Sequence, residues 1–159
     1  SKKALWHLFV QNRWRLDDQM FSEIDESDVV EVYLADGTQF FRNFNYFQYS
    51  SYTLADLIFC PWEELIEHES NSRAELFEIS KRIFAENASP KERFKLAPYF
   101  ARERFSERRF TAELKSKFIC PIRGRLTGSN EAALVVWSIR LVDEPALRTN
   151  NLYFIDATI

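Results

Sequence analysis

Residues 36–57, DGTQFFRNFNYFQYSSYTLADL, combine a turn, a short aromatic strand and the start of a helical region. The Asp-Gly pair at 36–37 follows an apolar run at 29–34, and this order predicts a hairpin because glycine adopts positive φ without steric cost. Asn43 closes the second strand, where its amide is placed to bridge backbone groups at a strand-to-helix crossing. Thr53 is expected to cap a helix that begins at the next residue. These residues therefore predict a hairpin that leads directly into helices.

The order of residues in this stretch resembles the opening of PAS domains, which typically read D-G-x-I-x-Y-x-N, then an aromatic residue, then G-Y-S-x-E-E-L. Two positions differ, because Ser51 stands where the family has a glycine and Ala55 replaces the first glutamate. The resemblance implies a sheet made from both ends of the chain, helices from the middle over it, and a sensory or regulatory role. The residues that fall at the family's offsets without a gap, these two differing positions included, are Asp36, Gly37, Phe40, Asn43, Tyr46, Ser51, Tyr52, Thr53, Ala55, Asp56 and Leu57.

Length and composition predict one globular domain. A chain of 159 residues with 46% hydrophobic and 16% aromatic residues can bury a core, and its bulky aromatic side chains either fill that core or line a cavity in it. No apolar run approaches the roughly 18 residues of a membrane span, and the first residues lack the apolar segment of a signal peptide. Cys60 and Cys120 lack metal-ligand spacing and are expected to be free thiols, so the expected compartment is cytoplasmic.

Charge is unevenly distributed along the chain. Residues 81–125 contain thirteen Lys or Arg and five Asp or Glu, whereas the rest contains eight and nineteen, for a net charge of −3. The two groups either pair within the fold or between subunits, or they form separate solvated faces. No nucleic acid is expected as a partner, because the chain is acidic and no recognised binding motif accompanies the clustered arginines, which are Arg102, Arg104, Arg108 and Arg109.

Residues 4–24 have the spacing of one amphipathic helix. Its aromatic stripe needs a partner, which is either the open face of the sheet or the same helix in another subunit. Because a leading helix often helps PAS domains to dimerise, the resemblance favours a homodimer. The expected organisation is this helix at 1–27, a PAS-like domain at 28–145 and a C-terminal extension at 146–159. The candidate dimer-interface residues are Trp6, Phe9, Val10, Trp14 and Phe21.

Strand-like alternation marks both ends of the domain. At 29–34 three aliphatic residues alternate with Glu31 and Tyr33, which indicates a strand with one solvated side. Two further strands are expected near the end of the chain. One has Phe110, Ala112, Leu114, Phe118, Cys120 and Ile122 on a shared face, and the other has Ala133, Val135, Trp137, Ile139 and Leu141.

The middle of the chain is largely helical in its spacing. Helices are expected at 54–59, from Pro61 to Ile66, and at 73–86, whereas 87–109 shows no clear pattern beyond one short helix between loops. Runs of strands and runs of helices predict an α+β fold, a PAS-like antiparallel sheet of about five strands with helices on one face. An NTF2-like cone is the alternative fold.

No catalytic constellation is present, so the chain is not expected to be an enzyme. Ser50 and its neighbour lack the glycine-flanked elbow of a hydrolase nucleophile, and three glycines are too few for a phosphate loop. The acidic cluster at 63–69 is interpreted as a solvated face. Haem is disfavoured because His68 lies earlier in the chain than the usual PAS haem ligand, and a flavin adduct is disfavoured because Cys60 lies in Phe-Cys-Pro-Trp. No cofactor and no metal are indicated.

A small-molecule pocket is the remaining candidate site. Its candidate residues are Asn43, Tyr46, Tyr49 and Trp62 on the helical side, facing Phe118 and Trp137 on the sheet; the alternative is that these side chains simply fill the core. We therefore expect a regulatory PAS-like domain that couples a ligand or partner to an output domain outside this chain. A ligandless dimerisation or docking module is the alternative function, and an NTF2-like protein is the third.

Overall fold

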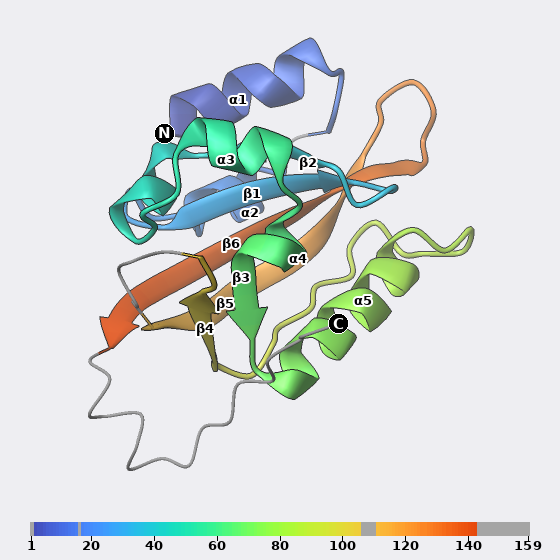
Figure 1. Ribbon diagram of the computed structural model, residues 1–159. Coiled ribbons are helices and arrows are strands. Elements are labelled where there is room, and N and C mark those ends of the chain that lie inside the picture. Colours follow the sequence, from blue (N-terminus) through green and yellow to red (C-terminus); the bar gives the residue numbers. More distant parts are fainter. Residues whose placement is uncertain (1, 16, 106–110, 143–159) are drawn as a thin grey trace.

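A computed structural model describes residues 2–15, 17–105 and 111–142 (Figure 1). The expected C-terminal extension at 146–159 lies outside these residues. In chain order the elements are α1 (Lys2–Gln11), α2 (Asp18–Ser22), β1 (Val29–Leu34), β2 (Gln39–Arg42), the 3₁₀ helix η1 (Phe44–Gln48), α3 (Leu54–Phe59), α4 (Trp62–Leu65), β3 (Ile66–His68), α5 (Ser70–Ile83), β4 (Tyr99–Glu103), β5 (Thr111–Arg123) and β6 (Asn130–Val142).

The strands form one antiparallel sheet in the order β2-β1-β6-β5-β4-β3. β1 pairs with β6 along its whole length, from Val29 opposite Trp137 to Leu34 opposite Ala132, so strands from both ends of the described chain lie side by side. The hairpin between β1 and β2 turns at Gly37, which has a positive φ of 85°. The α+β class, the hairpin and the joining of the two ends in one antiparallel layer are thus confirmed, as the PAS resemblance implied.

The sheet has six strands where about five were expected, and two of them, β3 and β4, were not predicted. β4 lies within 87–109, where one short helix between loops was expected, and β3 occupies residues where the sequence predicted the end of a helix and a solvated acidic face. Glu67 lies opposite Arg102 of β4, and its carboxylate is 2.6 Å from the Arg102 Nη2 atom. The Glu67 side chain is 5% exposed, so the prediction of a solvated face is wrong at this residue. The ion pair between Glu67 and Arg102 joins β3 to β4, so this acidic stretch forms an edge strand of the sheet and not part of a helix.

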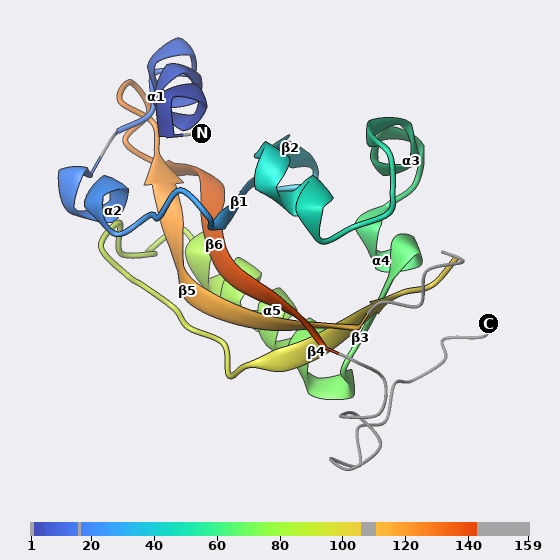
Figure 2. The same cartoon turned by 90° about the vertical axis from the view of Figure 1, so that its left-hand side faces the viewer.

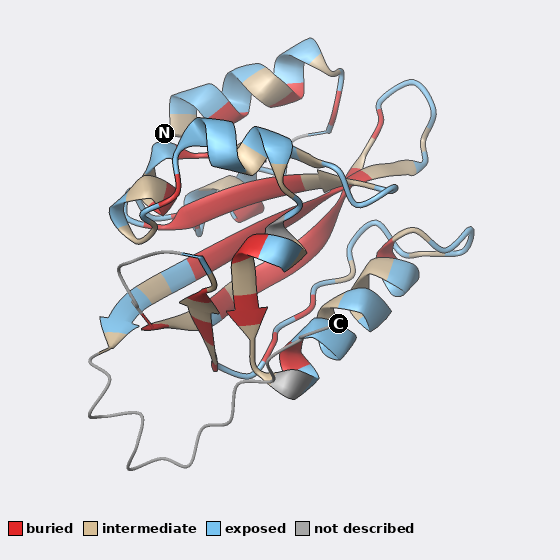
Figure 3. Ribbon diagram, viewed as in Figure 1, coloured by how far each residue is buried: buried red, intermediate tan, exposed pale blue. Residues whose placement is uncertain are grey.

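Both faces of the sheet are covered, and Figure 2 shows α1 and α2 on one side with α3 and α4 on the other. We call these sides the N-terminal face and the inner face. The N-terminal face buries Leu5, Phe9, Trp14, Met20, Ile24, Val30, Val32, Phe118, Cys120, Ile122, Ala132, Leu134 and Val136. The inner face buries Val29, Tyr46, Ile83, Phe94, Leu96, Tyr99, Ala101, Ile119, Ala133, Val135 and Trp137. Buried residues accordingly concentrate in the central strands (Figure 3).

The N-terminal region contains two helices, not the single helix predicted at 4–24. Arg13 adopts a φ of 54°, and the Arg15 N–H donates to the Arg123 carbonyl at 2.8 Å. The Asp17 carboxylate then accepts from the Gln19 N–H at 2.9 Å and caps α2. Pairing with the end of β5 therefore interrupts the helical pattern. Of the two expected partners for the aromatic stripe, the structure has the open face of the sheet, where Phe9 is fully buried.

A bulge in β5 changes which residues face the same way. Its register with β6 shifts between Ser116 and Phe118. Leu114 packs against the inner cluster, whereas Phe118 and the alternate residues after it lie on the N-terminal face. The single shared face predicted for this strand is therefore wrong, because one extra residue exchanges the two faces of a strand. For β6 the expected face is confirmed through Ile139.

The oppositely charged parts of the chain pair within the fold. Lys117 Nζ lies 2.7 Å from the buried Asp28 carboxylate, and Arg93 Nη1 lies 2.8 Å from Glu23. With the pair between Glu67 and Arg102, these contacts join the basic region at 81–125 to acidic residues outside it. Of the alternatives considered for the two charged groups, these residues therefore show ion pairing within one chain.

Candidate functional site

The inner face carries a buried ion pair. Glu31 of β1 is 6% exposed, and its Oε1 atom lies 2.7 Å from Nη2 of Arg42 on β2. The Trp137 Nε1–H of β6 donates to Glu31 Oε2 at 2.9 Å. The sequence pattern predicted that this side of β1 is solvated, and that prediction is wrong. The following segment η1 places Tyr46 over this side of the sheet, so the carboxylate is buried and needs these partners.

Two neighbouring polar side chains complete the partners of Glu31. The Tyr33 hydroxyl donates to Glu31 Oε2 at 3.2 Å, and Gln39 Nε2 donates to Oε1 at 3.2 Å and to the Tyr33 oxygen at 2.8 Å. Burial, with the Glu31 charge as the second cause, raises the pKa of Tyr33 well above its usual value. The tyrosine therefore stays neutral and donates its proton at physiological pH.

Only part of the hydrogen-bond donor capacity of Arg42 is used in this network. Its side chain is 7% exposed and its guanidinium carbon lies 3.6 Å from the centre of the Tyr46 ring. Its Nε and Nη1 groups and the Tyr46 hydroxyl are buried and make no hydrogen bond within 3.5 Å among the described residues. The Tyr33 hydroxyl still interacts with the Arg42 guanidinium, and Ser50 with the Tyr46 hydroxyl. Burial is the largest single influence and lowers the pKa of Arg42, but the Glu31 carboxylate together with Tyr33 and Tyr46 outweighs it, and the net effect raises the pKa of Arg42. A charged donor group with spare N–H bonds is thus held inside the domain.

Aromatic rings extend this region across the inner face. Tyr99 of β4 meets Trp137 edge to face at 5.9 Å between ring centres, and His68 of β3 lies 5.6 Å from Tyr99. Tyr46 also meets Phe47 edge to face at 5.6 Å. Burial raises the pKa values of Tyr46 and Tyr99. The side chains around Arg42 are therefore mainly aromatic, and the carboxylates of Glu31 and Glu103 act electrostatically on the Tyr46 ring that stacks on Arg42.

A second buried carboxylate fixes the segment between η1 and α3. Glu103 of β4 is 8% exposed and accepts from the Ser50 hydroxyl at 2.8 Å and the Ser51 N–H at 2.6 Å. The Tyr52 hydroxyl donates to the Leu65 carbonyl at 2.7 Å and accepts from the Phe105 N–H at 3.1 Å. These anchors were not predicted, since nothing in the sequence links a serine pair to an acidic residue fifty positions later.

The predicted pocket residues have different positions. Tyr46 and Trp137 lie together on the inner face and Tyr49 packs against that cluster, whereas Phe118 lies on the opposite, N-terminal face. Asn43 is buried and donates to the Asp28 carbonyl at 2.8 Å while accepting from the Val30 N–H at 3.1 Å. Its amide is thus the bridge that the sequence predicted. The side chain of Trp62 lies outside what the structure describes.

The predicted dimer residues are likewise divided. Phe9 and Trp14 are buried within the chain, and the Trp14 Nε1–H donates to Glu131 at 2.8 Å. Phe21 is partly buried against the same cluster. Trp6 and Val10 are each 46% exposed and, four residues apart, share the outward side of α1.

No family model matches the chain, and no curated protein matches it. Among solved structures, a domain described as that of a light and redox sensing histidine kinase from Haloarcula marismortui aligns with a TM-score of 0.47 and 14% identity. The alignment covers 79% of this chain and 97% of that one.

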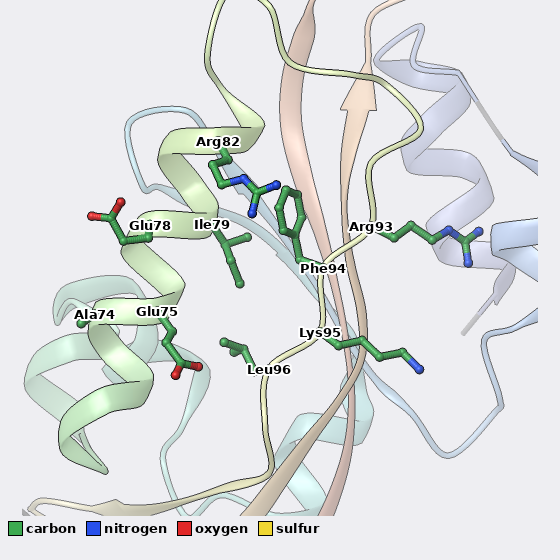
Figure 4. Close-up of a pocket in the computed structure, with 9 residues that line it drawn as sticks. All are labelled: Ala74, Glu75, Glu78, Ile79, Arg82, Arg93, Phe94, Lys95 and Leu96. Carbon is green, nitrogen blue, oxygen red and sulfur yellow. The ribbon is translucent and has the colours of Figure 1, made fainter.

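A groove lies apart from the inner-face site, between α5 and residues 93–96 (Figure 4). It has a volume of about 560 Å³ and is widely open to solvent. Glu75 and Glu78 line it on the α5 side, and the Arg82 guanidinium lies 4.6 Å from the Phe94 ring. None of the predicted site residues lines this groove. Its charged rims favour a solvated surface feature over a ligand pocket.

Chemically, the described residues offer binding groups. Among them no three or more His, Cys, Asp or Glu side chains are placed to hold a metal ion, and no helix is long and apolar enough to cross a membrane. Cys60 and Cys120 are free thiols, as expected. The buried carboxylates of Glu31, Glu67 and Glu103 are all held in hydrogen bonds or ion pairs. On the inner face, the Nε and Nη1 groups of Arg42 are buried donors without a hydrogen bond among the described residues.

Proposed function

We propose that this chain is a sensory or regulatory domain that binds a small molecule on its inner face, at Arg42 and Tyr46. The observation that carries the proposal is the buried guanidinium with two nitrogen groups that have no partner among the described residues. Burying such donors without a hydrogen bond costs free energy, which a bound acceptor would recover. The PAS-like order of the sequence around 36–57 and the antiparallel sheet support the same function.

Charge balance narrows the class of ligand. Glu31 and Arg42 neutralise each other inside the domain, and an ionised ligand would add an uncompensated buried charge. An uncharged molecule with acceptor oxygen or nitrogen atoms avoids that cost. The surrounding rings of Tyr46, Tyr99 and Trp137 favour a flat, partly aromatic body for the same molecule.

The segment around 50–52 supplies a route for a signal. A ligand beneath η1 would shift its packing, and Glu103 ties the end of η1 to β4 through Ser50 and Ser51. The ligand would thus bias a population of conformations that an output domain outside this chain senses. We infer that the domain works in the cytoplasm and is not itself an enzyme. Among the described residues, the buried carboxylates of Glu31, Glu67 and Glu103 are held in hydrogen bonds or ion pairs, which favours a structural role for them.

Native mass spectrometry of the full chain tests the proposal. We expect a small-molecule adduct on the purified protein that is lost in Arg42→Met. Because removing Arg42 alone leaves Glu31 buried without its charge partner, the double variant Glu31→Gln, Arg42→Met keeps the site neutral and should also lose the adduct. Arg140→Met, at a side chain that is 72% exposed, is the matched control and should keep it. An adduct retained by the double variant, or no adduct in any form, would contradict the proposal.

A ligandless dimerisation module is the second candidate function. It is favoured by Trp6 and Val10, which remain exposed next to each other on α1 although Leu5 and Phe9 of the same helix are buried. The same native spectra distinguish the two functions. An empty, stable dimer supports dimerisation, and a monomer or dimer that carries the adduct supports sensing.

A further inference from the structure

Residues 93–96 form a short strand edge with unused backbone groups. Phe94 exchanges two backbone hydrogen bonds with Ile119 of β5, each at 2.8 Å. The neighbours of a residue that is bonded in this antiparallel way point their own backbone groups to the opposite side. Among the described residues, the backbone N–H and C=O groups of Arg93 and Lys95 accordingly make no hydrogen bond. An edge of this kind is a template for a further strand.

The groove beside α5 runs along this edge (Figure 4). The side chains of Arg93 and Lys95 point away from α5, so these two residues border the groove with their main chain. The alternate side chains, Phe94 and Leu96, point toward α5 and form an apolar floor. On α5 the lining residues span 74–82, a helical length of about 12 Å, and the extended edge itself covers about 10 Å. An extended segment of about four residues therefore fits lengthwise between them.

The two sides of this edge carry charges of opposite sign. Glu75 is exposed on α5, and its carboxylate makes no ion pair or hydrogen bond with another described residue. On the other side the same holds for the exposed Lys95 ammonium, and Arg93 lies on the same side as Lys95. A strand with basic side chains toward α5 and acidic side chains toward Lys95 is therefore complementary to this edge. A second copy of the chain, paired through the same edge, would bring basic residues against basic residues.

We propose that the edge at 93–96 binds an extended segment of a partner protein as an added antiparallel strand beside α5. The segment alternates basic side chains, which face Glu75, with acidic side chains, which face Lys95. Backbone hydrogen bonds to Arg93 and Lys95 supply the affinity, and the alternate side chains supply the specificity. None of the residues that line the groove belongs to the network around Arg42, so the proposal goes beyond the proposed function.

Fluorescence anisotropy with the full chain tests the order of charges. The first probe is a labelled, capped peptide in which four arginines alternate with four glutamates, and the second has the same residues in blocks of like charge. Both peptides are neutral overall, so their general electrostatic attraction to the domain is matched. We expect the block peptide to bind at least about tenfold more weakly, because only alternation places the two charges on opposite faces of a strand. No binding of the alternating peptide, or equal binding of the two, would overturn the proposal.

Methylation of the peptide backbone tests the strand pairing. Residues opposite each other in an antiparallel pair have their side chains on the same face, so the glutamates of the peptide should donate their N–H groups to Arg93 and Lys95. N-methylation of the glutamates should therefore weaken binding about tenfold or more, because it removes these donors. N-methylation of the arginines, whose N–H groups point to the free side, is the matched control and should preserve binding. Equal effects of the two methylations would show that no strand edge is used, and the proposal would fail.

Charge reversal at Glu75 tests where the basic side chains bind. Glu75→Lys replaces an attraction by a repulsion at an exposed position and should weaken binding of the alternating peptide about fivefold. Glu86→Lys makes the same change at an exposed residue outside the groove and should leave the affinity unchanged. The melting temperatures of both variants should match that of the parent chain, because neither side chain is buried. An equal loss of affinity in the two variants, or no loss in either, would overturn the proposal.

Discussion

Single buried residues on the inner face decide what the domain can bind. Glu31 takes hydrogen bonds from Trp137, Gln39 and Tyr33, so its charge is compensated from three strands. Arg42 faces the same carboxylate with only part of its donor capacity used. In the sequence Glu31 occupies a polar position of an alternating strand. Alternation alone cannot distinguish a solvated residue from one that a later segment buries. That is why the network around it was not predicted.

His68 provides a prediction at this scale. Burial, with the charge of Arg73 as a lesser cause, lowers the pKa of His68 to about 4. An unfolded histidine has a pKa of about 6.5, so between these values the unfolded chain binds a proton that the folded chain does not. The contribution of neutral His68 to the free energy of unfolding is therefore complete above about pH 6.5. This free energy falls by roughly 3 kcal/mol as the pH is lowered toward 4.

Denaturant unfolding of the parent chain and of His68→Phe measures this dependence. Phenylalanine keeps a ring against Tyr99 but cannot take up a proton, so its stability should vary less between pH 7 and pH 4.5. Leu126→Ala, at an exposed residue without a titratable group, should leave the dependence as it is. Equal pH dependence in the parent and in His68→Phe would refute the assignment.

At the scale of elements, the sequence predicted what depends on local chemistry. The hairpin at Gly37, the Thr53 cap and the Asn43 bridge all follow from side chains acting within a few residues or on a neighbouring strand. The break between α1 and α2 and the bulge near Phe118 do not, because each depends on pairing with a distant strand. In the candidate site, Tyr46 and Trp137 were placed correctly, whereas the bulge moved Phe118 to the other face.

Helix α3 gives the prediction at this scale. Its Thr53 and Asp56 cap each other's backbone N–H groups, and it buries no residue of its own. Thr53→Ala should cost about 1 kcal/mol locally, which raises hydrogen exchange in α3 about fivefold with little change in the melting temperature. Thr127→Ala, in an exposed turn away from α3, is the control and should leave hydrogen exchange in α3 unchanged. A loss of melting temperature as large as that of a core substitution would mean that α3 is part of the cooperative core.

For the whole molecule, the pairing of β1 with β6 joins residues far apart in the chain into one layer. Both faces of that pair are covered, one by α1 and α2 and the other by η1 and α5. Neither strand has a separate core, since Val32 and Val136 belong to the same buried cluster. The two ends of the described chain should therefore lose their structure together, whereas α3, which has no buried residue, opens independently.

Hydrogen exchange of a core variant tests this coupling. Val136 is fully buried, and Val136→Ala should lower global stability by about 2 kcal/mol. The slowest amides of β1 and of β6 should both lose protection by that same amount, because they exchange only when the shared layer unfolds, and α3 should be unaffected. Leu126→Ala, at an exposed residue, is expected to change none of them. If β1 kept its protection while β6 lost its own, the two strands would unfold as separate units. The conformational effect of a ligand beneath η1 could then not be transmitted through the sheet to both ends of the domain.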